Sequence, residues 1–149
     1  MGQNSNIDLA KRVLKARFGY DAFRRGQLEL VCSILAGRDC LGVMPTGAGK
    51  SVCYQVPALV LAFEEDKNIA NDALFQPVRN VTLVISPLVS LMSDQVMALR
   101  AADIPAAYLN SRLSPSQQEE VLERAAAGAY ALLYVAPERL SDQRFRDVI

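Results

Sequence analysis

The stretch "CLGVMPTGAGKSVCY", residues 40–54, decides which fold the sequence predicts. Its first five residues, 40–44, are apolar and predict a short buried strand, and the glycine-rich run after them leads into an apolar helix. Strand, loop and helix in this order form the context of a phosphate-binding loop, although the usual pattern has glycine where this chain has Met44. The stretch is therefore either a nucleotide site of a particular subclass or a tight turn that carries a surface lysine.

A phosphate-binding loop meets the negative charges of a polyphosphate with backbone N–H groups and with the positive end of the following helix. Gly47 and Gly49 suit such a loop, because a Cβ would block a turn with positive φ or the close approach of a ligand. Lys50 is expected to reach the β and γ phosphates, and the Ser51 hydroxyl to ligate Mg²⁺. We therefore predict a nucleotide site with Lys50 and Ser51 in the catalytic roles and with these residues around the phosphates: Pro45, Thr46, Gly47, Ala48, Gly49, Lys50 and Ser51.

The remaining pattern predicts helices that alternate with apolar strands. Strands are expected at 81–85, 106–109 and 130–135. Helices are expected at 7–18 with Ser5 or Asn6 as the cap, at 25–36, at 50–63 with a kink or restart at Pro57, at 88–102, at 114–128 with a capping box, and after Ser141. Residues 64–80 mix charges, asparagines and a proline without periodicity, and predict a surface insertion. Helical connections between apolar strands indicate an α/β fold with a parallel sheet covered on both faces.

The composition fits one globular domain, with 51% hydrophobic and 21% charged residues. Sixteen basic and sixteen acidic side chains cancel, so a bound polynucleotide would need a local groove rather than a basic surface. The chain has no histidine and only three cysteines, at 32, 40 and 53, which excludes most zinc and triad chemistry within these residues. No apolar run is long enough to span a bilayer, and the first residues lack the apolar core of a secretory signal, so we expect no membrane partner and a cytosolic location.

Four motifs in a fixed order resemble those of RecQ-type DNA helicases, a family of superfamily 2. The glycine loop with its continuation, "MPTGAGKSVCYQ" at 44–55, resembles motif I of that family, in which a residue other than glycine is normal at the first position. Similar to further family motifs are "FGYDAFRRGQ" at 18–27, "ISPLVSLMSDQV" at 85–96 and "LYVAPERL" at 133–140. The resemblance implies a RecA-like P-loop NTPase lobe, with residues 38–149 as its first part and residues 1–37 as preceding helices with an adenine-recognition motif.

The resemblance also implies residue roles at the nucleotide. Tyr20, Arg24 and Gln27 match the adenine motif. A glutamine amide can pair with both the N6 donor and the N7 acceptor of adenine, which is a physical basis for choosing ATP over GTP. Tyr20 could stack on the base, and Arg24 could assist by stacking or hydrogen bonding. The cofactors implied are ATP and Mg²⁺, and Tyr20 and Phe23 could alternatively be core aromatics between two helices.

The later motifs imply a track for single-stranded DNA. Its neutral hydrogen-bond donors suit a phosphodiester backbone, which positions a strand without reading its sequence. Donors of this kind would reconcile DNA binding with zero net charge. The residues expected on the track are Ser86, Ser90, Gln95, Asn110, Ser111 and Arg139.

By the same resemblance, the acidic motif of the family and its second lobe lie beyond Ile149. ATP hydrolysis and translocation need groups from both lobes, so we expect the chain alone to be inactive as a helicase. We also expect an unpaired sheet edge that could support self-association.

Three functions remain open at this point. The first is the N-terminal part of an ATP-dependent DNA helicase of RecQ type that moves 3′ to 5′ on single-stranded or forked DNA in repair and recombination, located at the nucleoid of a bacterium or in the nucleus of a eukaryote. The second is part of a DEAD-box-like RNA helicase, although Cys53-Tyr54-Gln55 is not the usual continuation of motif I there. The third is a non-catalytic module that binds nucleotide or DNA.

Overall fold

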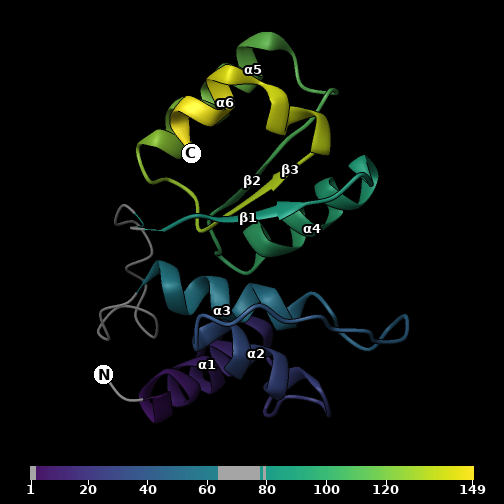
Figure 1. Cartoon of the computed structure of the whole chain (residues 1–149), viewed down its shortest axis with the longest axis vertical. Helices are drawn as coiled ribbons and strands as arrows, with labels where there is room; N and C mark the ends of the chain where they lie inside the picture. The colour runs from purple at the N-terminus through teal and green to yellow at the C-terminus, as the bar shows by residue number, and fades with distance from the viewer. Residues whose placement is uncertain (1–2, 64–77, 79) are drawn as a thin grey trace. The chain divides into compact units, whose positions relative to one another are not determined.

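The computed structural model describes residues 3–63, 78 and 80–149 (Figure 1). The chain divides into two compact units, residues 1–73 and residues 74–149. The expected surface insertion, 64–80, lies outside the described residues except for positions 78 and 80. In the described part of the chain, no helix combines the length and the apolar character needed to cross a membrane.

The first unit packs three helices around one apolar core. These are α1 (Gln3–Phe18), α2 (Gln27–Leu35) and α3 (Val52–Ala62). Residues on their facing sides are at most 2% exposed, namely Val13, Leu14, Val31, Val56 and Leu59. This agrees with the apolar periodicity of the sequence, because side chains three or four apart share a helix face.

The helix ends in this unit match the sequence in part. Gly19 and Gly37 follow α1 and α2 with φ angles of 72° and 69°, a conformation that glycine adopts without steric cost. Pro57 lies inside α3, which continues as one helix from Val52 to Ala62. The predicted cap of α1 is wrong, because the helix already begins at Gln3 and runs through Ser5.

The buried strand predicted at residues 40–44 is also absent. The segment forms no strand ladder, and Leu41 and Val43 are each 88% exposed. On the other side of the segment, Gly42 lies so close to Leu30 of α2 that a Cβ would come within 2.6 Å of its Cδ1. A strand exists only where a neighbour accepts and donates its backbone hydrogen bonds, and the three strands described in this chain pair only with one another.

The second unit is a three-stranded parallel sheet with helices on both faces, so the predicted α/β class is confirmed. Its strands are β1 (Thr82–Ile85), β2 (Ala106–Leu109) and β3 (Leu132–Val135), in the order β1-β3-β2. Ile85, Val135 and Leu109 stand in register at the ends of the three strands. All four residues of β3 are buried, as expected for a central strand covered on both sides. The outer edges of β1 and β2 are unpaired within the described residues.

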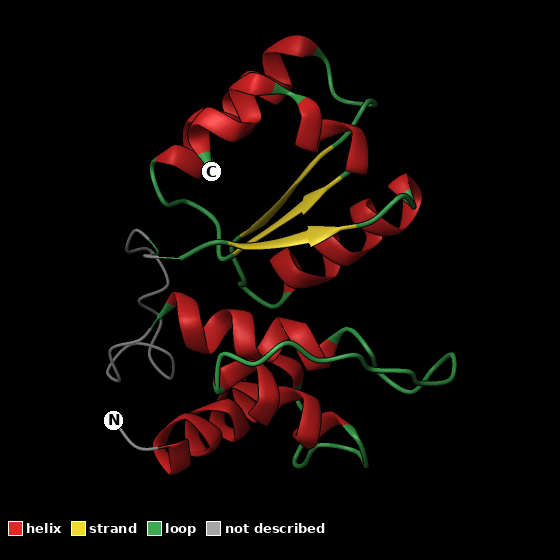
Figure 2. Ribbon diagram, in the orientation of Figure 1, coloured by secondary structure: helices red, strands yellow, loops and turns green. Residues whose placement is uncertain are grey.

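Helices of the second unit lie on opposite faces of the sheet (Figure 2). They are α4 (Val89–Ala101), α5 (Pro115–Ala126), α6 (Gln143–Val148) and the short 3₁₀ helix η1 (Pro137–Ser141). On one face, Leu122 of α5 and Phe145 of α6 pack with Leu133 and Val135 of β3. Helix α4 packs near β2 on the other face and buries Met92, Val96 and Leu99.

Two helix caps in this unit test the sequence rules. Ser114 and Gln117 form the predicted capping box, in which each side chain accepts a hydrogen bond from the backbone N–H of the other residue. The predicted cap at Ser141 is wrong by one residue. Asp142 caps α6 instead, and its Oδ1 accepts from the Arg144 N–H at 3.0 Å.

We expect Ser114→Ala to lower the free energy of unfolding by about 1 kcal/mol, because the change removes the hydroxyl that accepts from the Gln117 N–H at the start of α5. Ser93→Ala is the matched control. Ser93 lies inside α4, and its hydroxyl donates only to the Ser90 carbonyl within its own helix, so its change should stay within about 0.5 kcal/mol. Urea unfolding followed by circular dichroism measures both, and equal losses would contradict the role of the box.

Candidate functional site

The glycine loop joins the segment at 40–44 to the start of α3. Gly47 and Gly49 have φ angles of 81° and 76°, so both adopt the left-handed conformation for which the sequence had suggested glycine. Their surroundings differ. A Cβ on Gly47 would meet no atom within 4 Å, whereas a Cβ on Gly49 would lie 2.7 Å from Nε2 of Gln27. The loop thus needs glycine at 47 for its backbone angle, and at 49 for the angle and for space.

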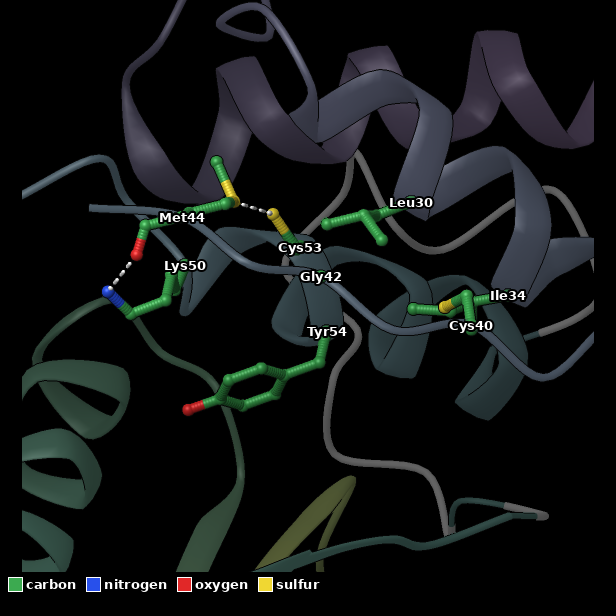
Figure 3. A pocket seen from close by; sticks show the side chains of 8 residues that line it. All are labelled: Leu30, Ile34, Cys40, Gly42, Met44, Lys50, Cys53 and Tyr54. Atoms are coloured by element: carbon green, nitrogen blue, oxygen red, sulfur yellow. Dashed lines mark hydrogen bonds between the residues drawn. The ribbon is translucent and has the colours of Figure 1, made fainter. Parts of the chain in front are cut away.

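Lys50 folds back over the loop that carries it. Its Nζ donates to the carbonyl oxygens of Met44 and Pro45, both at 3.0 Å. The Met44 side chain points the other way, and its Sδ lies 3.9 Å from Sγ of Cys53 (Figure 3). The residue that departs from the usual loop pattern therefore presents only its backbone to the lysine.

A cavity of about 350 Å³ lies beside the loop, between α2, the segment at 40–44 and α3. Leu30, Gly42, Met44, Cys53 and Tyr54 are among its lining residues, and Lys50 stands at the same cavity (Figure 3). Burial raises the pKa of the Cys53 thiol, and a backbone hydrogen bond only partly offsets this. Cys53 is therefore a neutral side chain in the cavity wall at neutral pH, as expected for a buried cysteine.

The residues of the predicted adenine motif contact the loop directly. Gln27 is 4% exposed, and its Nε2 donates to the carbonyl oxygens of Ala48 and Gly49, both at 3.1 Å. Its Oε1 accepts from the Arg24 N–H at 2.8 Å, and Arg24 Nη1 donates to the Gly47 oxygen at 3.1 Å. The structure thus brings two of the three motif residues to the glycine loop.

Tyr20 is the aromatic member of the same motif. Its side chain is 48% exposed, and its backbone N–H donates to the Leu14 carbonyl after the end of α1. The neighbouring Asp21 pairs with Lys15 at 3.1 Å. An aromatic ring that is half exposed is open to a stacking partner, so the role of Tyr20 at the base stays a prediction.

The second unit brings some of the residues predicted for DNA to one edge of its sheet. Ser86, Asn110 and Ala136 each follow directly after a strand, and parallel strands end at the same edge. Two backbone hydrogen bonds tie these ends together, from Ser86 N to Val135 O and from Ala136 N to Leu109 O, both at 3.1 Å. Ser111 and η1, which contains Arg139, continue from this edge. Ser90 lies exposed in the first turn of α4, and Gln95 follows further along that helix.

The predicted DNA residues differ in how accessible they are. Asn110 is 1% exposed, and its Oδ1 accepts from the Arg112 N–H at 2.9 Å, which shapes the turn after β2. Ser86 Oγ accepts from the Leu88 N–H at 3.2 Å. Arg139 has an ion pair to Asp142 at 3.6 Å, while its Nε is buried and has no hydrogen-bond partner within the described residues. The contact of each with DNA stays a prediction, and for Asn110 the geometry supports a structural role in the turn.

A family model described as DEAD/DEAH box helicase matches residues 24–148. The chain belongs to this family. It is 45% identical over 140 residues to the ATP-dependent DNA helicase RecQ of Haemophilus influenzae, in an alignment that covers 94% of this chain and 20% of that protein. It is 44% identical over 137 residues to the ATP-dependent DNA helicase RecQ of Bacillus subtilis, in an alignment that covers 91% of this chain and 20% of that protein. The chain thus spans about a fifth of the length of these two relatives.

The similarity extends to plants. The chain is 40% identical over 134 residues to ATP-dependent DNA helicase Q-like 5 of Arabidopsis thaliana, in an alignment that covers 90% of this chain and 13% of that protein. These relatives confirm the resemblance to RecQ-type helicases, and they favour it over the DEAD-box-like RNA helicase.

Sequence reasoning missed the contact between Gln27 and the loop. The motif had indicated that Gln27 reads a base, and a spacing along the chain cannot show which backbone atoms a side chain will meet. The one available signal was the glycine at position 49, next to Lys50, because a glycine can mark a close approach as well as a turn. The sequence also did not predict that Lys50 would donate to the carbonyl oxygens of Met44 and Pro45.

We expect Gly49→Ala to destabilise the chain more than Gly47→Ala. Both changes place a Cβ on a left-handed residue, at a cost of about 1–2 kcal/mol. Only the Gly49 change also displaces the Gln27 amide, which adds about 1 kcal/mol for the hydrogen bonds lost. Urea unfolding of the two variants in parallel measures the difference, and equal losses would show that the Gln27 side chain moves aside at no cost.

Proposed function

We propose that this chain is the N-terminal part of the motor of a RecQ-type ATP-dependent DNA helicase, and that residues 45–51 hold the phosphates of ATP. The observation that carries the proposal is the loop itself: two left-handed glycines, a lysine held over the loop, and an adenine-motif glutamine in contact with it. The RecQ relatives, which are named as ATP-dependent DNA helicases, support the same conclusion.

The residues present fit ATP–Mg²⁺. The start of α3 directs the positive end of an eleven-residue helix at the loop, which favours bound anions. Lys50 supplies the positive charge for the β and γ phosphates once it leaves the carbonyls of Met44 and Pro45, and Ser51 supplies a hydroxyl for Mg²⁺. The metal ion would neutralise phosphate charge during hydrolysis. Tyr20 would stack on adenine, with Arg24 beside it and Gln27 as the group that selects the base.

For the second unit, we propose a track for single-stranded or forked DNA along the carboxyl edge of the sheet. Neutral donors at Ser86, Ser90, Gln95 and Ser111 would position the phosphodiester backbone, and Arg139 would supply one charge. Unwinding in the 3′ to 5′ direction during repair and recombination, at the nucleoid or in the nucleus, belongs to the whole protein in this proposal.

We expect the chain to bind ATP–Mg²⁺ saturably and more tightly than GTP–Mg²⁺. Lys50→Ala should weaken ATP binding by about tenfold or more, because a charged hydrogen-bond donor to the phosphates is lost. Lys11→Ala is the matched control, since Lys11 is an exposed lysine of α1 that pairs with Asp8 at 4.0 Å, and it should leave binding unchanged. Isothermal titration calorimetry measures all three proteins. If Lys50→Ala binds ATP as tightly as the unchanged chain does, the loop is not the phosphate site.

We expect single-stranded DNA to bind the chain with a shallow dependence on salt. If Arg139 is the one cation on the track, log K should fall against log[KCl] with a slope of about −0.7. Arg139→Gln should flatten this slope, whereas Arg144→Gln, which removes an exposed arginine that pairs with Glu119, should not. Fluorescence anisotropy of a labelled oligothymidine across a KCl series provides the slopes, and a slope several times steeper would place further basic residues on the DNA.

A further inference from the structure

Three consecutive carbonyl groups of the phosphate-binding loop are held by side chains from outside the loop. Arg24 holds the Gly47 oxygen, and Gln27 holds the oxygens of Ala48 and Gly49, each at 3.1 Å. These contacts join the start of α2 to a loop more than twenty residues later in the chain.

A held carbonyl fixes the direction of the neighbouring N–H. The peptide group is planar and trans, so its C=O and N–H point to opposite sides. The oxygens of Ala48 and Gly49 share their peptide groups with the N–H groups of Gly49 and Lys50. Within the described residues, neither of these two N–H groups donates to a backbone carbonyl, whereas the Ala48 N–H closes the turn onto Pro45 at 3.2 Å. Gln27 therefore sets the direction of two N–H groups that remain for a ligand.

The orientation of the Gln27 amide is fixed by its surroundings. Its oxygen faces the Arg24 N–H at 2.8 Å, and its nitrogen faces two carbonyl oxygens. A flipped amide would place oxygen against two oxygens and nitrogen against an N–H group, so only one assignment satisfies all three contacts. Gln27 is 4% exposed, and the missing Cβ of Gly49 leaves room for its nitrogen. Both donors of the amide are thus used on the loop.

We propose that Gln27 is a positioning residue for the phosphates: it aims the N–H groups of Gly49 and Lys50 by holding the carbonyls behind them, with Arg24 supporting the same loop at Gly47. This rests on the proposed ATP site, and it goes beyond base selection. The chemistry recognised is a polyphosphate, whether or not a base is attached. In the described conformation the Gln27 amide has no donor left for adenine, so reading the base would require release of the loop.

A ligand without a base separates the two roles. Inorganic tripolyphosphate with Mg²⁺ is titrated against the 149-residue chain by calorimetry, in parallel with ATP–Mg²⁺. The variant Gln27→Met keeps the volume of a nearly buried side chain and removes both donors without adding charge. Gln27→Asn, which shortens the amide by one methylene, serves where the first variant does not fold. Gln118→Met is the matched control, because Gln118 also donates its Nε2 to a backbone carbonyl, that of Leu113 at 2.8 Å, but in the second unit.

The expected result is that Gln27→Met weakens tripolyphosphate binding by about tenfold and ATP binding by at least as much, while Gln118→Met changes neither. In the ligand-free chain, the amide ¹H–¹⁵N resonances of Gly49 and Lys50 should also shift in Gln27→Met. Unchanged tripolyphosphate binding with weakened ATP would overturn the inference and leave the ATP site intact, since Gln27 would then act on the base alone. An equal loss of affinity in Gln118→Met would also overturn the inference, because the loss would then reflect lower stability rather than the position of Gln27. A wild-type chain that binds neither ligand would overturn the proposed ATP site, and the inference with it.

Discussion

The backbone hydrogen bonds of β3 are the interaction on which the second unit depends. Both other strands pair with β3, and the register of these pairs sets Ile85, Leu109 and Val135 level with one another. Every loop that leaves the sheet in the chain direction therefore starts from the same edge. Residues far apart in the sequence, such as Ser86 and Arg139, therefore both follow strands that end at this edge of the sheet. The helices then add the burial that keeps the strands together, because each face of β3 is covered by a different set of apolar side chains.

The glycine loop of the first unit follows a segment, residues 40–44, that forms no strand ladder within the described residues. Side chains hold the loop instead, since Gln27 and Arg24 donate to its carbonyls and Lys50 donates to those of Met44 and Pro45. Each of these hydrogen bonds contributes only about 1 to 3 kcal/mol, with the larger values for the charged donors Arg24 and Lys50, so the position of the loop depends on several of them together.

The sequence predicted most where local rules and burial agree. The β-branched run at 81–85, the capping box of Ser114 and Gln117, and the left-handed glycines at 47 and 49 all appear as expected. It failed where a partner far along the chain decides. The apolar run at 40–44 has the composition of a strand, yet only a neighbour can make it one. For Gln27 the sequence did not reveal the contacts with the loop, because no pattern of residue types shows which carbonyl a buried amide will meet; its role at the base stays a prediction.

The departure at Met44 is explained by which parts of a phosphate-binding loop need glycine. Glycine is required where φ is positive or where a Cβ would collide, and in this loop those conditions hold at 47 and 49. Met44 has no positive φ, so a side chain there carries no such strain. Its side chain leads toward Cys53 and away from the lysine, while its carbonyl oxygen serves Lys50 as that of a glycine would. The first position of the motif thus acts through its backbone, and its side chain is left to build the cavity wall between α2 and α3.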